Sequence, residues 1–176
     1  MEKVEAVDYR ALVAAVLEQY VLAPGGTHGV PHWGRVLENG RRLAAETGAD
    51  PSIVQCFAIL HDARRLDDRR DLQHGPRAAG FAASLRGSLL ALGDADFELL
   101  HYAIAHHTDG MTEGEPTVIT CWDADRLDLY RVGIMPSAEK LCTEAAKQAD
   151  FIAWAADRGR WRTVPELVER EWAWRP

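Results

Sequence analysis

The dipeptide His61-Asp62 is the feature that most constrains how this chain folds. It follows a mostly apolar run, residues 53–60, whose spacing predicts a helix within the core. A carboxylate directly after such a helix would be buried, and a buried charge is costly unless a partner neutralises it. A divalent cation shared with nearby imidazoles provides that neutralisation. The pair therefore predicts a metal site, whereas a core histidine followed by a solvent-facing aspartate is the simpler alternative for these two residues alone.

Two other segments place potential ligands on apolar helix faces. Pro31 suits the first turn of a helix, and apolar residues follow it at three- and four-residue steps, with His32 at the edge of that stripe. Asp125 lies three residues after Trp122 and four before Leu129, so it shares their face. Two imidazoles and two carboxylates form a mixed set that suits Mn, Fe, Co, Ni, Mg or Zn dications. The predicted metal ligands are His32, His61, Asp62 and Asp125.

The order of these residues resembles the signature of the HD superfamily of metal-dependent phosphohydrolases: a histidine, a His-Asp pair and a later aspartate. The resemblance runs from about residue 27 to residue 133, and the last ligand of the signature, the aspartate directly before an arginine, corresponds to Asp125. Asp123 and Asp128 are then expected to support the ligands or to lie on the helix surface. The resemblance implies a divalent metal cofactor, with one or two ions per chain.

Further histidines extend this resemblance. Segment 104–110 is similar to the helix end where larger HD enzymes, including cyclic-nucleotide phosphodiesterases, carry additional histidines. His107 also lies on an apolar stripe, so it should face the same interior. His74 precedes a predicted helix start, where backbone N–H groups and the helix dipole favour an anion. We expect a second metal or the substrate phosphate at His74, His106 and His107, and leave His28 and His101 outside the site.

Such a site suits hydrolysis at phosphorus. A dication held by four protein ligands keeps positions for water and substrate, and it lowers the pKa of that water toward neutrality. Negative charge that grows on the phosphoryl oxygens needs cations, and three arginines stand near predicted ligands in the sequence: Arg35, Arg77 and Arg126. Each could equally lie on the surface. His107 or His74 is the predicted donor of a proton to the leaving oxygen.

Departures from the larger HD enzymes narrow the substrate. The Gly-Tyr-Pro segment of cyclic-dinucleotide phosphodiesterases is missing after His107, and residues 63–65 replace the acidic segment of the stringent-response hydrolases. Small HD proteins of this length are similar to nucleotide pyrophosphatases or nucleotidases, so we expect a nucleotide or another small phosphorylated metabolite. Two alternatives stay open. One is a di-iron HD-type oxygenase, since the histidines and aspartates also fit the order of its ligands, and the other is a ligand-binding module without turnover.

Composition favours a soluble domain. The 176 residues, 47% of them hydrophobic, fit one HD-type domain over residues 1–176, with the motif core at 27–133 and C-terminal helices at 137–174. A net charge of −7 argues against nucleic-acid binding, and no apolar run approaches the roughly 20 residues that span a membrane. Three widely spaced cysteines indicate neither a disulfide framework nor a thiolate zinc site. We therefore expect a cytoplasmic protein.

No alternating strand pattern is visible, so the sequence predicts an all-α, compact helical bundle of the HD-domain type. Helices are expected over residues 4–22, 31–44, 51–60, 76–92, 94–107, 117–129 and 137–158, with a short one after Pro165. The loop 108–116 is the best candidate for a lid, or else a plain connector. Four tryptophans are expected to bury the C-terminal tail, with a homodimer contact as the alternative: Trp154, Trp161, Trp172 and Trp174.

Overall fold

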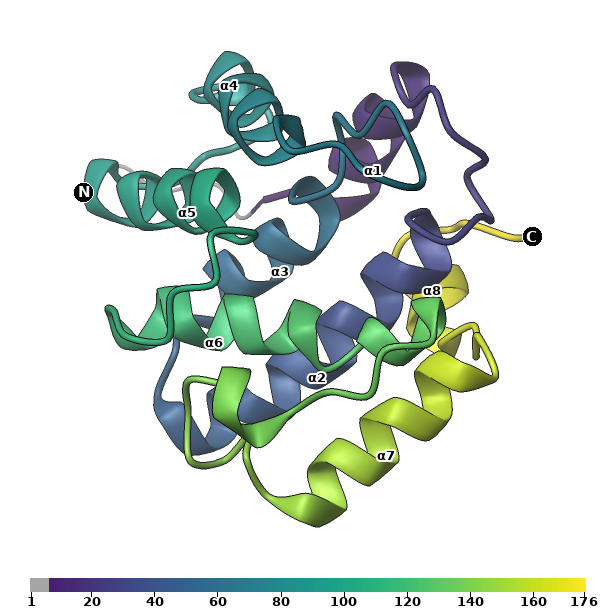
Figure 1. Cartoon of the computed structure of the whole chain (residues 1–176). Coiled ribbons are helices and arrows are strands. Elements are labelled where there is room, and N and C mark those ends of the chain that lie inside the picture. The colour runs from purple at the N-terminus through teal and green to yellow at the C-terminus, as the bar shows by residue number, and fades with distance from the viewer. Residues whose placement is uncertain (1–6) are drawn as a thin grey trace.

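The protein is built from helices joined by loops, and the computed structural model describes residues 7–176 (Figure 1). In chain order the helices are α1 (Tyr9–Glu18), α2 (Val30–Thr47), α3 (Pro51–Leu60), α4 (His74–Leu85), α5 (Asp94–His106), α6 (Pro116–Arg126), the short 3₁₀ helices η1 (Leu129–Val132) and η2 (Ala138–Lys140), α7 (Ala149–Arg160) and α8 (Glu166–Arg170). No strand forms within this range. The predicted all-α class is confirmed.

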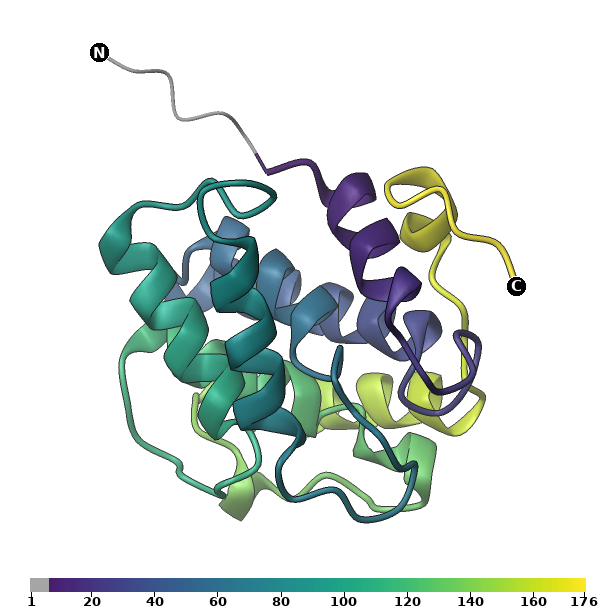
Figure 2. The same cartoon turned by 90° about the horizontal axis from the view of Figure 1, so that it is seen from above.

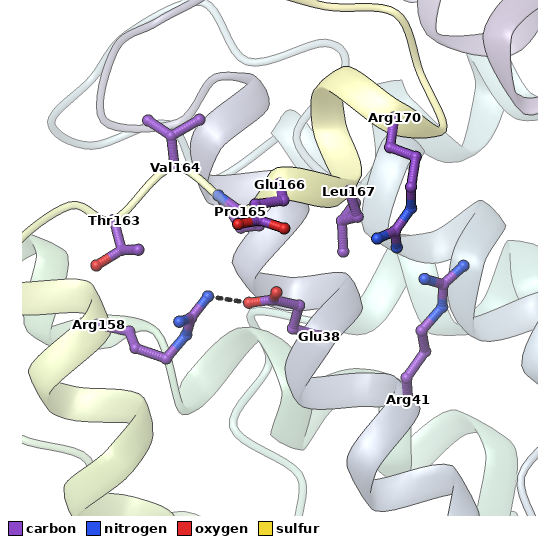
Figure 3. Close-up of a pocket in the computed structure, with 9 residues that line it drawn as sticks. All are labelled: Glu38, Arg41, Arg158, Thr163, Val164, Pro165, Glu166, Leu167 and Arg170. Carbon is purple, nitrogen blue, oxygen red and sulfur yellow. Dashed lines mark hydrogen bonds and ion pairs between the residues drawn. The ribbon is translucent and has the colours of Figure 1, made fainter.

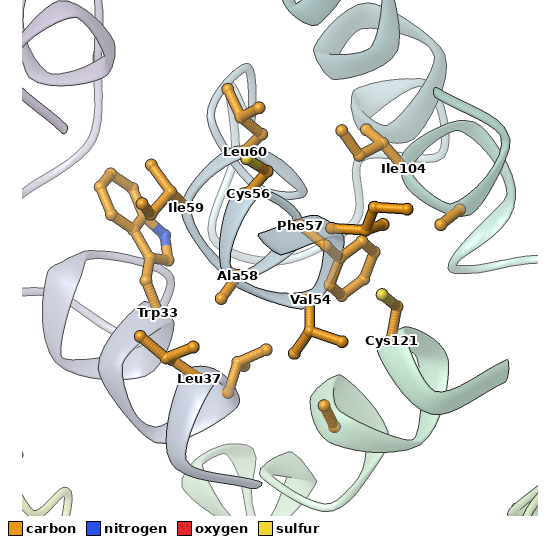
Figure 4. Close-up of a cluster of buried hydrophobic side chains, with 14 of the residues drawn as sticks. Trp33, Leu37, Val54, Cys56, Phe57, Ala58, Ile59, Leu60, Ile104 and Cys121 are labelled. Atoms are coloured by element: carbon orange, nitrogen blue, oxygen red, sulfur yellow. The ribbon is translucent and has the colours of Figure 1, made fainter. Parts of the chain in front are cut away.

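Helix α3 lies at the centre of the bundle, between α2, α5 and α6 (Figure 1). Every side chain from Ile53 to Leu60 is buried, and Figure 4 shows the apolar residues of neighbouring helices around it. A helix that is apolar on all sides is stable only when it is enclosed. Because α3 is enclosed, the residues that follow it directly, His61 and Asp62, also lie in the interior.

Two local features fix α3 in place. The Asp50 carboxylate accepts hydrogen bonds from the N–H groups of Ser52 and Ile53, which confirms the predicted N-cap ahead of Pro51. Gly40 of α2 allows a close approach, because a Cβ at this position would lie 2.4 Å from Val54 Cγ1. Together these features hold the first turn of α3 and its packing against α2.

The first predicted helix is longer than the observed one. Residues 4–6 of the prediction lie outside the described residues, while α1 begins at Tyr9, where the Asp8 carboxylate caps its first turn. The helix ends at Glu18 instead of residue 22. After it the chain turns back, and the hydroxyl of Tyr20 donates to the carbonyl of His28 at 2.8 Å.

The predicted helix 137–158 is wrong in its first half, where η2 and a loop with a turn at residues 144–147 precede α7. The cause is Asp123, a buried carboxylate of α6. It accepts the backbone N–H groups of Cys142 and Thr143, each at 2.8 Å, and so takes donors that a helix would use. Gly159 does not stop α7 but lies within it, where a Cβ would come 3.1 Å from the backbone nitrogen of Arg131.

Two other segment predictions need correction. The helix expected at 76–92 covers His74–Leu85, so His74 is its first residue instead of preceding it. Of the four C-terminal tryptophans, Trp172 is buried and Trp154 and Trp174 pack against the core, but Trp161 is 69% exposed. Trp161 follows the last residue of α7 and contacts that helix's own polar end, where its indole N–H donates to Asp157.

The short helix after Pro165 is present as α8, and it lies beside α1 and the start of α2 in the view from above (Figure 2). Cys56 and Cys121 are buried, Cys142 is partly buried, and all three are free thiols. Among residues 7–176, no helix combines the length and the apolar character needed to cross a membrane.

Candidate metal centre

The structure brings the four predicted metal ligands together at the ends of three helices. His32 comes from the first turn of α2, His61 and Asp62 follow α3, and Asp125 is near the end of α6. The Nε2 atoms of His32 and His61 are 3.0 Å apart. Asp125 Oδ1 lies 3.4 Å from the first of these nitrogens and 3.6 Å from the second, and Asp62 Oδ2 lies at 3.6 and 3.8 Å.

The hydrogen bonds of His32 and His61 show which nitrogen of each ring carries the proton and which has a free lone pair. His61 Nδ1 lies 3.1 Å from the carbonyl oxygen of Phe57, which can only accept, so this nitrogen carries the proton. His32 Nδ1 donates in the same way to Asp128 Oδ2 at 2.7 Å. Neutral rings in these tautomers have no hydrogen on Nε2, so their 3.0 Å contact cannot be a hydrogen bond. A proton or a cation has to lie between them.

Asp125 supplies the observation that favours a cation. Its Oδ1 atom is buried beside both Nε2 atoms and accepts no hydrogen bond from any residue between 7 and 176. A buried carboxylate oxygen without a donor is costly, whereas a bound dication would satisfy it. Ligand atoms about 2.1 Å from one metal lie roughly 3 Å or more from each other, which agrees with the separations here. These residues therefore fit a divalent metal.

Electrostatics favour the metal-binding forms of three of the four predicted ligands, His32, Asp62 and Asp125. Burial, together with nearby Arg131 and the facing His61, holds the pKa of His32 well below its usual range, so the ring is neutral at pH 7. Burial opposes ionisation of Asp62, but His61 and two imidazole hydrogen bonds outweigh it and lower its pKa well below the usual range. Burial likewise opposes ionisation of Asp125, while His61 and Arg131 bring its pKa to about 2.

A second group of potential ligands shares Asp62 with the first. His74 Nε2 lies 3.1 Å from Asp62 Oδ1 and 2.9 Å from His107 Nε2, and His107 Nε2 lies 3.9 Å from the same oxygen. His107 Nδ1 donates to the carbonyl of Ile104 at 2.7 Å, which leaves its Nε2 free to bind a cation. Asp62 thus directs Oδ2 toward the first pair of imidazoles and Oδ1 toward the second. His32, His61 and Asp62 have the spacing of a metal site, and so do Asp62, His74 and His107. Asp125 lies beside the two imidazoles of the first group.

The second group depends on a close contact between α4 and α5. A Cβ on Gly75 would lie 2.9 Å from the carbonyl oxygen of Ala105, so only glycine allows the two helices to approach at this point. Burial and the facing His61 lower the pKa of His107 to about 4. Burial also acts on His74, but its hydrogen bond to Asp62 outweighs burial and raises the pKa.

His28 is the residue of this centre that the sequence did not assign. It is buried, its Nδ1 lies 2.9 Å from Asp62 Oδ2, and its Nε2 lies 3.1 Å from the carbonyl of Asp68. His28 lies in the turn before α2, so helical periodicity gives no signal for it in the sequence. His101 stays outside the centre, where its ring lies beside Phe97.

Comparisons with known proteins bear on the fold of the chain. No protein-family model and no curated protein matches the sequence. Among solved structures, the chain is similar to the crystal structure of a predicted HD superfamily hydrolase from an uncultured Thermotogales bacterium. The two are 27% identical, the similarity covers 93% of this chain and 91% of that one, and the TM-score is 0.63. This chain has the HD-domain fold. The resemblance predicted from the sequence is confirmed at the level of the fold.

Asp128 and Asp123 bind different parts of the molecule. Asp128 supports the site, because it holds His32 and also accepts two hydrogen bonds from Arg35, at 2.8 and 3.0 Å. Asp123 instead anchors the loop before α7. Arg35 binds Asp128 and the carbonyl of Thr163. It does not line the cavity that lies above the predicted metal ligands, so its predicted role as a phosphate-binding cation is wrong.

The other predicted cations also lie elsewhere. Arg77 pairs with Asp71. Arg126 donates to the carbonyl of Lys140, because it follows Asp125 directly on the helix and so points in a different direction. His106 is partly exposed and pairs with Asp109, away from the ligands. The cavity of about 400 Å³ above the HD-domain ligands is lined instead by three other arginines: Arg65, Arg69 and Arg131.

Proposed function

We propose that this protein is a metal-dependent phosphohydrolase that cleaves a phosphoester or phosphoanhydride bond in a small metabolite. The observation that carries the proposal is a pair of buried guanidinium groups beside the predicted ligands. Arg65 Nη1 lies 3.7 Å from Asp62 Oδ1, and Arg131 Nη2 lies 4.0 Å from Asp125 Oδ1. Each carboxylate that would bind a metal thus has a fixed cation beside it, which is the environment that a phosphoryl group needs.

Both arginines are held in position before any substrate binds. Arg65 donates to the carbonyls of Asp67 and Arg69, at 2.9 and 3.1 Å. Arg131 donates to the carbonyls of Thr27 and Asp128, each at 3.1 Å. These four bonds hold the inner guanidinium nitrogens beside the cavity, where Arg65 Nη1 lies 3.2 Å from His74 Nε2 and Arg131 Nη2 lies 3.4 Å from His28 Nδ1. A substrate therefore does not meet the entropic cost of ordering a free side chain.

In this proposal His32, His61, Asp62 and Asp125 hold one dication, and Asp62, His74 and His107 hold a second. A bound dication supplies an activated water and polarises the phosphoryl oxygens. The chain's own residues orient and neutralise: Arg65 and Arg131 bind phosphoryl oxygens, and Asp128 keeps the Nε2 atom of His32 directed inward. An Nε2 atom that binds a metal cannot also donate a proton, so we assign the metal role to His74 and His107.

The proposed substrate is a nucleotide or another small phosphorylated metabolite. A cavity of about 400 Å³ is within the range of small-molecule sites. Thr108, the first residue of the loop 108–116, is in its wall, which agrees with a lid at this loop, although that role stays a prediction.

The test is phosphate or pyrophosphate release from a panel of nucleotides and sugar phosphates, with metal-loaded protein in air and under nitrogen. We expect release that does not depend on oxygen, and its loss in His61→Ala, because that change removes an inward nitrogen. Arg77→Ala is the matched control, since this arginine lies outside the cavity. No release from any member of the panel, with full metal content, would contradict the proposal.

A di-iron oxygenase is the second candidate, because the six residues that such an enzyme would use do converge: His32, His61, Asp62, His74, His107 and Asp125. The same panel separates the two functions. Two tightly bound irons, oxygen consumption and no phosphate release would favour the oxygenase.

A further inference from the structure

A second cavity, of about 390 Å³, adjoins the one above the ligands. Leu129 and Ile134 line both cavities, so these side chains form the partition between them. The same chain segments continue from one to the other, since Asp125 faces the first cavity and Arg126 the second. We call the second cavity the loop pocket, defined by Gly110, Arg126, Leu129, Ile134, Met135, Pro136, Ser137, Lys140 and Leu141.

The loop pocket differs chemically from the cavity above the ligands. Its walls are mostly apolar and include Met135, Pro136 and Leu141. Arg126 forms one side, but its Nη1 atom is engaged by the carbonyl of Lys140 at 2.9 Å and its guanidinium lies 5.7 Å from the ring centre of Trp122. Its Nη2 atom is buried and has no hydrogen-bond partner among the described residues, and Ser137 and Lys140 add polar groups to the lining. The pocket therefore suits a mainly apolar group that carries no positive charge.

The loop between η1 and η2 leaves large apolar side chains exposed at this place. Ile134 is 54% exposed and Met135 is 55% exposed, and Val132 of η1, next to them, is 42% exposed. Clustered apolar side chains on a surface mark a binding site more often than isolated ones do. Here the cluster borders the loop pocket, which shares Leu129 and Ile134 with the cavity above the predicted metal ligands. A molecule that lies over these two side chains would reach both cavities.

We propose that the loop pocket binds the apolar organic part of the phosphorylated substrate, an aromatic or branched aliphatic group. This inference rests on the proposed function, because the phosphoryl end of the same molecule would lie between Arg65 and Arg131. The two ends of the site then match the two ends of the substrate. The site is cationic beside the predicted metal ligands, where the phosphoryl group would lie, and apolar beyond Ile134, where the organic group would lie. Inorganic pyrophosphate and other compounds without an organic group would use only the first end.

Binding of phosphonates tests this pocket, since their carbon–phosphorus bond resists hydrolysis. The probes are methylphosphonate, 3-phenylpropylphosphonate and 3-phenyl-1-propanol, titrated by calorimetry into metal-loaded protein. We expect the phenylpropyl compound to bind at least about tenfold more tightly than methylphosphonate, because its ring leaves water. In Met135→Asn this ratio should fall to about two, with the affinity for methylphosphonate unchanged.

Val21→Asn is the matched control, because Val21 is also an exposed apolar residue but lines neither of the two cavities. We expect it to keep the full preference for the ring. Equal binding of the two phosphonates would overturn the pocket and leave the phosphohydrolase proposal intact. A third outcome is that wild type binds 3-phenyl-1-propanol but neither phosphonate, and that Met135→Asn does not bind the alcohol. This result would support the apolar pocket and overturn the phosphate site. If no probe binds, the pocket is overturned.

Discussion

Two charged regions of this molecule resemble each other in composition and differ in how their charges are satisfied. One is the candidate metal centre. The other is a cavity of about 440 Å³ between α2, α7 and α8, which we call the C-terminal cavity (Figure 3). Three arginines and two glutamates line it: Glu38, Arg41, Arg158, Glu166 and Arg170. Glu38 pairs with Arg158 across the cavity, and Arg41 pairs with Glu171 at 2.6 Å.

The comparison shows how a ligand site differs from a set of surface ion pairs. In the C-terminal cavity, acids meet bases and the partners stay partly exposed, and the one buried unpartnered atom there among the described residues is a nitrogen, Arg158 Nε. In the metal centre, two pairs of imidazole nitrogens face each other, and Asp125 Oδ1 accepts nothing from the described residues. Surface pairs contribute little and need no ligand, whereas a buried carboxylate without a donor does. The number of charged side chains in a cavity is therefore a poorer guide to function than the balance of its hydrogen-bond donors and acceptors.

The largest effect is expected from Asp62→Ala, because each oxygen of this carboxylate faces one of the two groups of potential ligands. We expect bound metal to fall below a tenth of the wild-type content and hydrolysis to be lost. Elemental analysis after dialysis against a weak chelator measures the first quantity. Glu38→Gln in the C-terminal cavity is the control and should keep full metal. Wild-type metal content in Asp62→Ala would place the cation elsewhere.

His107→Ala should remove one of two metals, since it changes only the second group. We expect metal content to fall from about two ions per chain to about one. The decisive comparison is with Asp125→Ala, which lies in the first group and should lose the other ion. If His107→Ala retains both ions, His107 contacts the substrate and not a metal.

Asp128→Asn tests support for the ligands at a distance. The amide keeps the size of the side chain but binds the Nδ1–H group of His32 more weakly, so we expect metal affinity to fall about 10- to 100-fold. Competition with a chromogenic chelator measures this change. Asp123→Asn is the matched control, because Asp123 binds the loop before α7 and should alter stability but not metal affinity.

Acid should destabilise the metal-free protein. The pKa of His107 is about 4 in the fold, lowered by burial, and about 6.5 in an unfolded chain. Between these values the unfolded state binds the proton and the folded state does not, so stability falls as the pH decreases from 6.5 to 4. The buried His32 acts in the same direction. Thermal unfolding in excess chelator should show a shallower pH slope for His107→Gln, and an unchanged slope would contradict the assignment.

The smallest effect is expected in the C-terminal cavity. Glu38 and Arg158 are both partly exposed, so Glu38→Gln should reduce the free energy of unfolding by no more than about 1 kcal/mol. Chemical denaturation measures this value. A loss of metal or activity in the same variant would remove the distinction between the two regions.

The sequence predicted the residues that local periodicity places, and missed those that distant contacts place. His32, Asp125 and His107 each lie on an apolar helix stripe, and such a stripe indicates the direction of a side chain without knowledge of its neighbours. Arg126 failed for the same geometric reason: it follows Asp125 directly, about 100° further around the helix. Its sequence neighbour faces the metal centre, and it faces the loop pocket.

Contacts between distant segments explain the other differences. Arg131 reaches the centre because Thr27, more than one hundred residues earlier, accepts its Nε–H group. The helix expected from residue 137 is interrupted because Asp123 binds two of its backbone N–H groups. Neither interaction has a signal within a short window of sequence.

The shared carboxylate of Asp62 has a consequence for how the two groups would fill. Its Oδ2 and Oδ1 atoms belong to one rigid plane, so a cation that fixes the plane at the first group also presents the second oxygen to His74 and His107. Occupancy of one position then changes the affinity of the other by the same factor in both directions, as thermodynamic linkage requires. A titration of the apoprotein should therefore show positive cooperativity between the two ions instead of two independent affinities.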